Sequence, residues 1–426
     1  MAIHTIGEIC YINAHSIKKG EYPKRILYLD TANLVEGRVC KMQEMNFTDA
    51  PSRAQRRIKN NTILYSSVRP NLKHFGIMTN MPSNVIVSTG FITFDVIDNS
   101  RFSPHYIYYL LTQQNIINYL QGIAQNGVSA YPSINPSDIA NLKFNFPSLS
   151  EQEHIASVLS NIDRKIALNR QINDNLEAMA KQLYDYWFVQ FDFPDEDGKP
   201  YKSSGGAMVW NEKLKCEIPQ GWSISNVKSL IEPIKRGISY SSDDLLDPFA
   251  TPMINLACFS KAGDYRLGEM KFFSGKVSND KLISPMDMLI ACTDMTQGAD
   301  IIGRPILASD EYDQYTFSTD LALITPKGKF KMYLYYTLRT PFYHKYIRPF
   351  ASGTTVKHLN LIGVENYGLP VPPIEIQSKF EDLITPIKEK QSKNLNEINA
   401  LTKQRDELLP LLMNGQATVN YHLSDD

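Results

Sequence analysis

The residues best suited to chemistry in this sequence are cations, and the chemistry they suit is the binding of phosphate. The densest positive cluster in the chain lies in the segment APSRAQRRIKNN, directly before a predicted strand, and contains Arg53, Arg56, Arg57 and Lys59. Arg69 and Lys73 follow in a loop marked by a proline. Two basic loops around one strand would suit phosphate contacts, with some arginines placed to hydrogen-bond base edges. The alternative interpretation is an ordinary solvated surface.

No motif for catalysis or metal binding accompanies these cations. The sequence contains no glycine-rich phosphate loop, no GxSxG, no HExxH and no metal-ligand spacing among its eight histidines. Asp95 and Asp98 lie close together, but paired acids in a turn are commonplace and no metal motif adjoins them. Residues 135–137 only approach the Asn/Asp-Pro-Pro-aromatic motif of amino-methyltransferases, and we interpret them as a turn. The sequence therefore indicates a binding protein without a cofactor of its own.

The net charge of −1 hides an uneven distribution. Residues 1–150 carry 14 Lys and Arg against 9 Asp and Glu, and residues 222–371 carry 16 against 15. The segments 151–221 and 372–426 are acidic, with 8 cations against 12 anions and 6 against 9. Five scattered cysteines without CxxC spacing argue against a disulfide framework and for a reducing cytoplasm. No apolar run could span a bilayer, so we expect a cytoplasmic protein.

The basic cluster lies among short predicted strands at residues 25–29, 62–68, 84–89 and 91–97. A helical pattern follows from Ser103, and we assign its stripe of Tyr106, Tyr109 and Leu110 to core packing. Next comes a glycine-containing loop and a short strand. These alternations predict an α+β domain.

A long helix over residues 147–190 follows this domain. Ser150 and Glu153 match a capping box, and seam residues then recur at spacings of three and four, as in a coiled coil. The pattern returns 225 positions later, behind a second proline. The residues predicted to form the seam or a partner interface are Ile162, Lys165, Asn169, Leu176, Leu183, Ile387, Lys390, Asn394, Leu401 and Leu408. Two unrelated amphipathic helices are the alternative, but shared polar seam residues favour a duplication.

The globular half recurs as well. Five segments of the first half reappear in the same order, PMINLACF for RILYLDTA and DMLIACTD for NTILYSSV among them, and Gly127 aligns with Gly353 at a tight loop. By position near the matching loops, the second set of candidate binding residues is Lys276, Lys281, Arg304, Lys357 and His358. We predict domain 1 at 1–150, helix 1 at 151–190, a connector at 191–221, domain 2 at 222–371, helix 2 at 372–415 and a tail at 416–426. Pro386 predicts a break or kink in helix 2.

The sequence resembles the DNA-specificity subunits of type I restriction-modification systems, nearly from end to end. The resemblance rests on the duplicated plan, the strand-to-helix junction NFPSLSEQEHIASVLSNIDRKI and the connector FPDEDGKPYKSSGG. The second junction, PPIEIQSKFEDL, departs from the family because it lacks the Glu-Gln pair and keeps only Gln377.

The resemblance implies two homologous target-recognition domains, separated by two long helices that pair as an antiparallel coiled coil in a pseudo-two-fold arrangement. It implies a non-catalytic subunit that binds double-stranded DNA at an asymmetric bipartite target. A helix of roughly 30 residues is about 45 Å long and one duplex turn is about 34 Å, so an unread spacer fits between half-sites. The implied partners are two methyltransferase subunits that use S-adenosylmethionine and motor-nuclease subunits that use ATP and Mg²⁺. Two rival hypotheses stay open: the recognition subunit of another defence or methylation assembly, and a duplicated coiled-coil scaffold that binds only protein.

Overall fold

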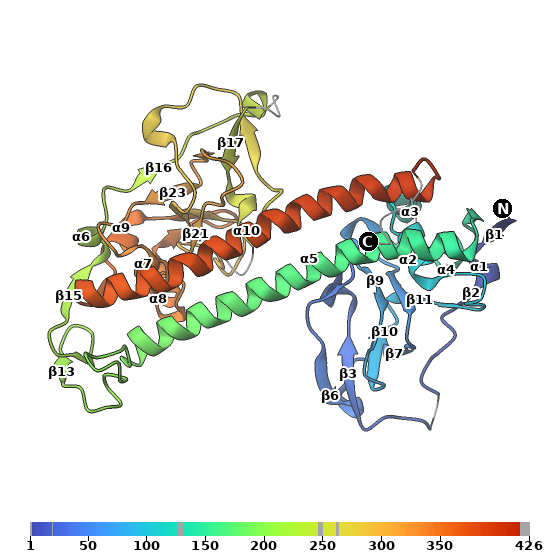
Figure 1. Ribbon diagram of the computed structural model, residues 1–426, viewed down its shortest axis with the longest axis horizontal. Helices are drawn as coiled ribbons and strands as arrows, with labels where there is room; N and C mark the ends of the chain where they lie inside the picture. Colours follow the sequence, from blue (N-terminus) through green and yellow to red (C-terminus); the bar gives the residue numbers. More distant parts are fainter. Residues whose placement is uncertain (1, 19, 127–131, 246–249, 261–263, 418–426) are drawn as a thin grey trace, which may run out of the picture. The chain divides into compact units, whose positions relative to one another are not determined.

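The computed structural model describes residues 2–18, 20–126, 132–245, 250–260 and 264–417, and the chain divides into two compact units (Figure 1). One unit contains Met1–Ala167 and Leu401–Asp426, and the other contains Leu168–Ala400. Two long helices, α5 (Leu149–Tyr184) and α10 (Ile374–Met413), each contribute one segment to each unit. Each unit therefore combines a globular domain with a pair of helical segments.

The described residues of the first domain form two four-stranded sheets and two two-stranded sheets, β1-β12 and the short pair β4 (Leu34–Val35) and β5 (Arg38–Val39). The inner sheet contacts α2 and has the order β2-β11-β8-β9. The outer sheet has the order β6-β3-β10-β7. The other strands are β1 (Ala2–Thr5), β2 (Cys10–Ile12), β3 (Arg25–Leu29), β6 (Gln43–Asn46), β7 (Ala54–Arg57), β8 (Thr62–Ser66), β9 (Phe75–Met78), β10 (Val85–Ser88), β11 (Phe91–Val96) and β12 (Lys143–Phe146), with β1 paired to β12. The helices are α1 (Ile6–Ile9), α2 (Pro104–Leu111), α3 (Gln114–Asn126) and α4 (Pro136–Ala140). The predicted strands are confirmed, and so is core packing for Tyr106, Tyr109 and Leu110, which are buried.

The second domain repeats this topology. Its sheets have the orders β16-β23-β19-β21 and β18-β17-β22, and β15 pairs with β26 as β1 pairs with β12. The strands are β15 (Ser223–Asn226), β16 (Lys235–Arg236), β17 (Thr251–Ile254), β18 (Lys271–Phe273), β19 (Met288–Ala291), β20 (Thr293–Asp294), β21 (Pro305–Leu307), β22 (Thr316–Phe317), β23 (Leu321–Ile324), β24 (Ala351–Ser352), β25 (Lys357–Leu359) and β26 (Gly368–Val371). The helices are α6 (Val227–Leu230), α7 (Lys331–Thr337), α8 (Pro341–Ile347) and α9 (Leu361–Glu365). The α+β class and the internal repeat are therefore confirmed.

The two copies differ at the edges of their sheets. Among the described residues, β7 has no counterpart strand in the second domain, where a single bridge between Ile283 and Tyr315 stands in its place. Where the second domain has a small sheet of order β20-β25-β24, the described residues of the first domain have a single bridge between Val68 and Ser133. Gly353 adopts φ +118°, and a Cβ there would lie 2.0 Å from the Val356 carbonyl oxygen, so the tight loop requires glycine. Gly127, its partner in the repeat, lies outside the described residues.

Helix α5 begins at Leu149, two residues before the start at residue 151 that the sequence predicts. The Ser148 hydroxyl accepts a hydrogen bond from the Glu151 amide at 3.3 Å, whereas the Ser150 hydroxyl contacts His154. The predicted capping box of Ser150 and Glu153 is therefore wrong. The sequence contains two overlapping Ser-x-x-Glu patterns, and the helix uses the first, in which Ser148 directly precedes Leu149. A short π-helical turn, Asp185–Val189, continues α5.

Helix α10 is continuous through Pro386, so a break at this residue is wrong, and the alternative of a kink stays a prediction. A proline removes the hydrogen bond to the carbonyl four residues earlier. Here both Pro386 and Asp382 are exposed, where water can satisfy that carbonyl, while Phe380 and Ile384 are anchored in the core. At the other end, Gly415 adopts φ +66° and the amides of Gly415 and Gln416 donate to Leu412 and Leu411. That pattern is a Schellman cap.

The helical segments pair antiparallel within each unit. In the second unit, Asn169 donates to Glu397 at 2.8 Å and Asn394 donates to Asn173 at 2.8 Å. In the first unit, Asp163 faces Arg405 at 3.1 Å. The predicted seam residues Ile162, Leu176, Leu183, Ile387, Leu401 and Leu408 are half-buried, and Asn169 and Asn394 are buried. Lys165 and Lys390 are exposed, because the seam runs through Ile166 and Gln391 beside them.

The connector between α5 and β15 is an ordered segment. Phe191 and Phe193 pack on Trp222, with ring centroids 5.5 and 5.4 Å apart, and Tyr201 stacks on Phe193 at 4.7 Å. A hairpin of β13 (Met208–Asn211) and β14 (Cys216–Pro219) projects from this aromatic cluster. The connector is therefore ordered because its aromatic residues belong to the main apolar core of the second unit.

Candidate nucleic-acid interface

The predicted cations of the first domain divide into two groups. Arg56 and Arg57 lie on the edge strand β7, and Arg53 lies directly before it, with its carbonyl accepting from the Thr89 amide. Lys59 is exposed in the turn that follows β7, before β8 begins. Arg69 and Lys73 lie beyond the other end of β8, so the structure does not bring all six residues into one patch.

The alternation of β7 separates its two arginines. Ala54 is buried and Gln55 is exposed, and Arg56 shares the half-buried side while Arg57 is exposed. Arg57 donates to the Glu21 carbonyl oxygen at 3.1 Å. Burial lowers the pKa of Arg56, and its Nη1 is buried without a hydrogen-bond partner among the described residues. A buried charged donor left unsatisfied is costly, so this nitrogen is available for an acceptor that the chain does not supply.

A second basic segment, SIKKGEYPKR, not selected from the sequence, begins beside β7. Ser16 bridges Arg56, and the Arg57 amide donates to the His15 carbonyl oxygen, so residues 15–17 pair with the outer edge of β7, whereas Arg25 already belongs to β3. The described cations of the segment, Lys18, Lys24 and Arg25, are exposed. The run of four cations in ten residues was visible in the sequence, but only the pairing with β7 connects it to the predicted cluster.

Lys73 and Arg69 have different surroundings from the cations of β7. Lys73 forms an ion pair with Glu36 at 2.9 Å and lines a cavity against the helical segments. Arg69 adopts φ +48° in an exposed turn, and its amide donates to the Pro132 carbonyl oxygen. Lys73 is therefore positioned by its own domain, which makes it a weaker candidate for contact with phosphate.

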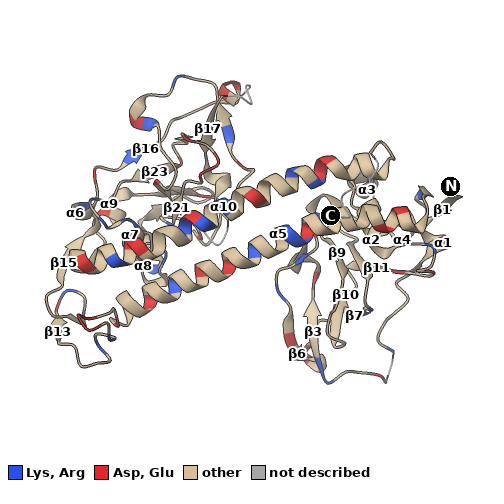
Figure 2. Cartoon of the chain, viewed as in Figure 1, with Lys and Arg blue, Asp and Glu red and all other residues tan. Residues whose placement is uncertain are grey.

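The second-domain candidates are also dispersed. Lys276 is exposed after β18, and Lys281 donates to the Arg236 carbonyl oxygen at 2.7 Å. Lys357 and His358 lie on β25, which pairs with β20. Arg304 is half-buried, and its pKa is lowered by burial and then by the charge of Arg339. Figure 2 shows the resulting scatter of Lys and Arg over the second unit.

Asp95, Asp98 and two of the cysteines have different surroundings. Asp95 is buried and accepts from Thr62 at 2.5 Å, whereas Asp98 is half-buried and its pKa is lowered by hydrogen bonds from Ser100. Burial raises the pKa of Cys10 to about 12 and that of Cys258 to about 11, which keeps these thiols protonated. Among the described residues, no three His, Cys, Asp or Glu side chains are grouped to hold a metal, and no described helix is long and apolar enough to cross a membrane.

The family model described as type I restriction modification DNA specificity domain matches residues 2–178 and again 219–403. The chain belongs to this family. The two matches coincide with the two copies of the repeated topology, each with its following helix.

Among relatives of this DNA-specificity family, the Type I restriction enzyme HindI specificity subunit of Haemophilus influenzae is 23% identical over 97% of this chain and 98% of its own length. The Type I restriction enzyme MjaIX specificity subunit of Methanocaldococcus jannaschii is 26% identical over 76% of this chain and 72% of its own length. The solved structure of the type I restriction-modification S subunit from M. genitalium has 16% identity and a TM-score of 0.57, and covers 96% of this chain and 95% of that one. That likeness supports the family's fold for this chain.

Proposed function

We propose that this chain is the DNA-specificity subunit of a type I restriction-modification enzyme, and that each domain reads one half of an asymmetric, bipartite target in double-stranded DNA. The observation that carries the proposal is the repeat of one sheet topology with different rims. The first copy presents β7 and its arginines, and the second presents the small sheet with Lys357 and His358. Two frameworks of one kind with different rims suit two half-sites of different sequence.

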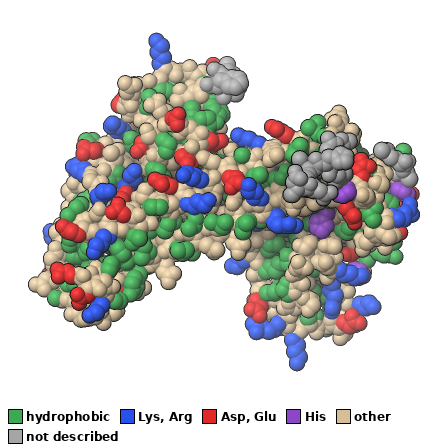
Figure 3. All heavy atoms as spheres, in the orientation of Figure 1, with side chains coloured by type: hydrophobic (Ala, Val, Ile, Leu, Met, Phe, Trp, Pro, Cys, Tyr) green, Lys and Arg blue, Asp and Glu red, His purple; other side chains and the backbone are tan. Residues whose placement is uncertain are grey.

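In this proposal the chain supplies recognition, and the chemistry belongs to partner subunits. Two modification subunits would bind S-adenosylmethionine and methylate the DNA, and motor-nuclease subunits would use ATP and Mg²⁺. Within the second unit, α5 and its π-helical turn expose Leu168, Met179, Tyr186 and Val189 at spacings of eleven, seven and three. Figure 3 shows apolar side chains at the surface along this segment, and such a stripe suits a modification subunit.

The test is a genome-wide map of methylated adenines in host cells with and without this gene. We expect deletion to remove one gapped motif and the wild-type gene to restore it. A second strain carries Lys357→Ala and His358→Ala. Because both residues lie in the second domain, we expect the methylated motif of this strain to differ from the wild-type motif in one half-site and to keep the other half-site.

An unchanged map on deletion, in a host where the partner genes are expressed, would overturn the proposal. The matched control is Lys213→Ala, at an exposed position in the connector hairpin between β13 and β14. We expect this control to leave both halves of the motif unchanged.

A further inference from the structure

The repeat places an arginine in one domain where the other has a threonine. Helices α2 and α7 begin 227 positions apart, at Pro104 and Lys331, and this offset pairs Tyr108 with Tyr335 and Thr112 with Arg339. The same offset pairs Tyr109 with Tyr336 and the start of α3 at Gln114 with the start of α8 at Pro341. The two positions after α2 and α7 are therefore structurally equivalent.

In the second domain, Arg339 joins three elements. Its Nη2 lies 2.6 Å from Asp264 and 3.7 Å from Glu177 of α5, and its guanidinium lies 5.2 Å from the centre of the Tyr335 ring. Asp264 belongs to the turn next to the Phe259–Tyr265 bridge, which corresponds to the β4–β5 hairpin (Leu34–Val35 and Arg38–Val39) of the first domain. The guanidinium thus connects the outer part of the domain to the helix.

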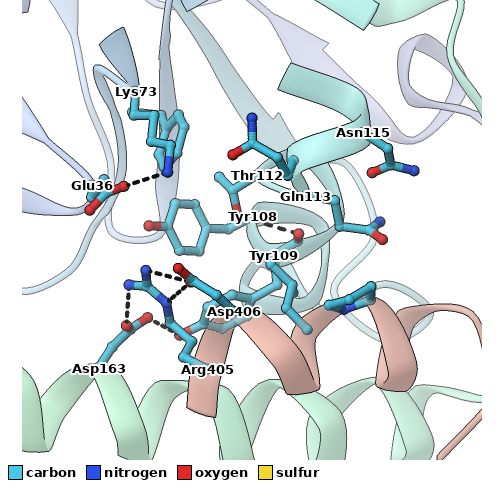
Figure 4. Close-up of a pocket in the computed structure, with 14 residues that line it drawn as sticks. Glu36, Lys73, Tyr108, Tyr109, Thr112, Gln113, Asn115, Asp163, Arg405 and Asp406 are labelled. Atoms are coloured by element: carbon cyan, nitrogen blue, oxygen red, sulfur yellow. Dashed lines mark hydrogen bonds and ion pairs between the residues drawn. The ribbon is translucent and has the colours of Figure 1, made fainter. Parts of the chain in front are cut away.

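In the first domain, Thr112 is too short to do this, and a cavity of about 390 Å³ remains (Figure 4). Tyr108 lies between the Glu36–Lys73 pair, beside the β4–β5 hairpin, and Arg405, which contacts Asp163 and Asp406. The lining therefore contains three carboxylates and two cations. Gln113 also lines the cavity; it is 4% exposed, and its Oε1 has no hydrogen-bond partner among the described residues.

We propose that this cavity, the Thr112 cavity, receives one arginine side chain from a partner protein. The reasons are the surplus carboxylate, the open acceptor on Gln113, and the occupation of the equivalent place by Arg339. A guanidinium stacked on Tyr108 would balance the charge and supply donors to Glu36 and Gln113. The partner belongs to the assembly of the proposed function, on which this inference rests.

The test measures the unfolding temperature of the full chain with about 20 mM N-acetyl-L-argininamide, or with the same concentration of its neutral isostere N-acetyl-L-citrullinamide. We expect a rise of about 2 °C with the arginine probe and none with the citrulline probe. Thr112→Arg should abolish the response because it fills the cavity, whereas Thr112→Val keeps the cavity and should keep the response. Asp406→Asn provides a second variant that removes the surplus charge and should also abolish it.

Equal responses to the two probes, or an undiminished response in both Thr112→Arg and Asp406→Asn, would overturn the proposal. The measurement needs no DNA and no partner. If this test fails while the methylation map still shows a gapped motif that depends on the gene, the arginine site is excluded and the DNA-recognition proposal stands.

Discussion

At the scale of single residues, Arg53, Arg56 and Arg57 show how one short strand can hold cations in two different states. Arg53 and Arg57 are exposed, whereas Arg56 is half-buried with one unsatisfied nitrogen. Exposed arginines suit phosphate, and a guanidinium held in place by its surroundings suits a base edge. We therefore expect Arg53 and Arg57 to contribute affinity and Arg56 to contribute specificity.

The double variant Arg53→Ala, Arg57→Ala should weaken DNA binding by the assembled enzyme and flatten its dependence on salt. Each lost phosphate contact lowers the slope of log K against log salt by about 0.9, so we expect a reduction of about 2. Fluorescence anisotropy from about 50 to 200 mM salt measures the slope. Lys213→Ala is the matched control and should leave the slope unchanged. A slope that stays at the wild-type value in the double variant would exclude both arginines from the interface.

At the scale of elements, a buried ion pair joins α5 and α10 in the second unit. Glu177 contacts Lys388, whose side chain is 7% exposed, and Arg339 lies 3.7 Å away. Burial alone raises the pKa of Glu177, but the two cations outweigh burial, so its pKa lies below the ordinary value of 4.5. Because the folded pKa is depressed, the stabilisation is present at neutral pH and is lost as the pH falls below about 4.5.

Glu177→Gln should therefore destabilise the second unit by about 3 kcal/mol at pH 7, because it leaves the Lys388 ammonium buried without its carboxylate. Adding Lys388→Met should restore much of that loss. Urea unfolding followed by circular dichroism measures the effect, and the gap between wild type and Glu177→Gln should narrow at acid pH. Asp185→Asn breaks an exposed pair with Lys181 and should cost less than about 1 kcal/mol. A similar cost for both substitutions would contradict a buried pair.

The element order could be predicted from the sequence because apolar runs and turn residues mark strands locally, and because the internal repeat shows the same order of elements twice. The seam register could not be predicted in full. Two neighbouring stripes of α5 satisfy spacings of three and four, and only packing against α10 selects the one with Ile166 over the one with Lys165. The partner of Lys73 was equally hidden, since Glu36 reaches it only through the fold.

At the scale of the whole molecule, we expect the length of the paired helices to set the gap between the two half-sites, as a ruler would. Asn169 opposes Glu397, so lengthening α5 alone would shear the pairing and the buried amide contacts with it. We expect a matched insertion of one heptad, after Asn169 and after Asn396, to lengthen the spacer by about 10 Å. The gap in the methylated motif should then grow by up to about three base pairs, with both half-sites unchanged. Sequencing of methylated bases reads both quantities, and a changed half-site or an unchanged gap would refute the ruler.

The first unit is assembled from two stretches of chain that lie far apart in sequence, and this has a consequence for biosynthesis. Leu409 and Leu412 belong to the same apolar core as Ile6 and Phe94. Residues 168–400 must leave the ribosome between them, which takes roughly ten to fifty seconds at 5–20 residues per second. During that interval the nascent N-terminal domain waits with an incomplete core. A chaperone that holds the growing chain would therefore bind this domain until its C-terminal segment emerges, although the ribosome makes the domain earliest.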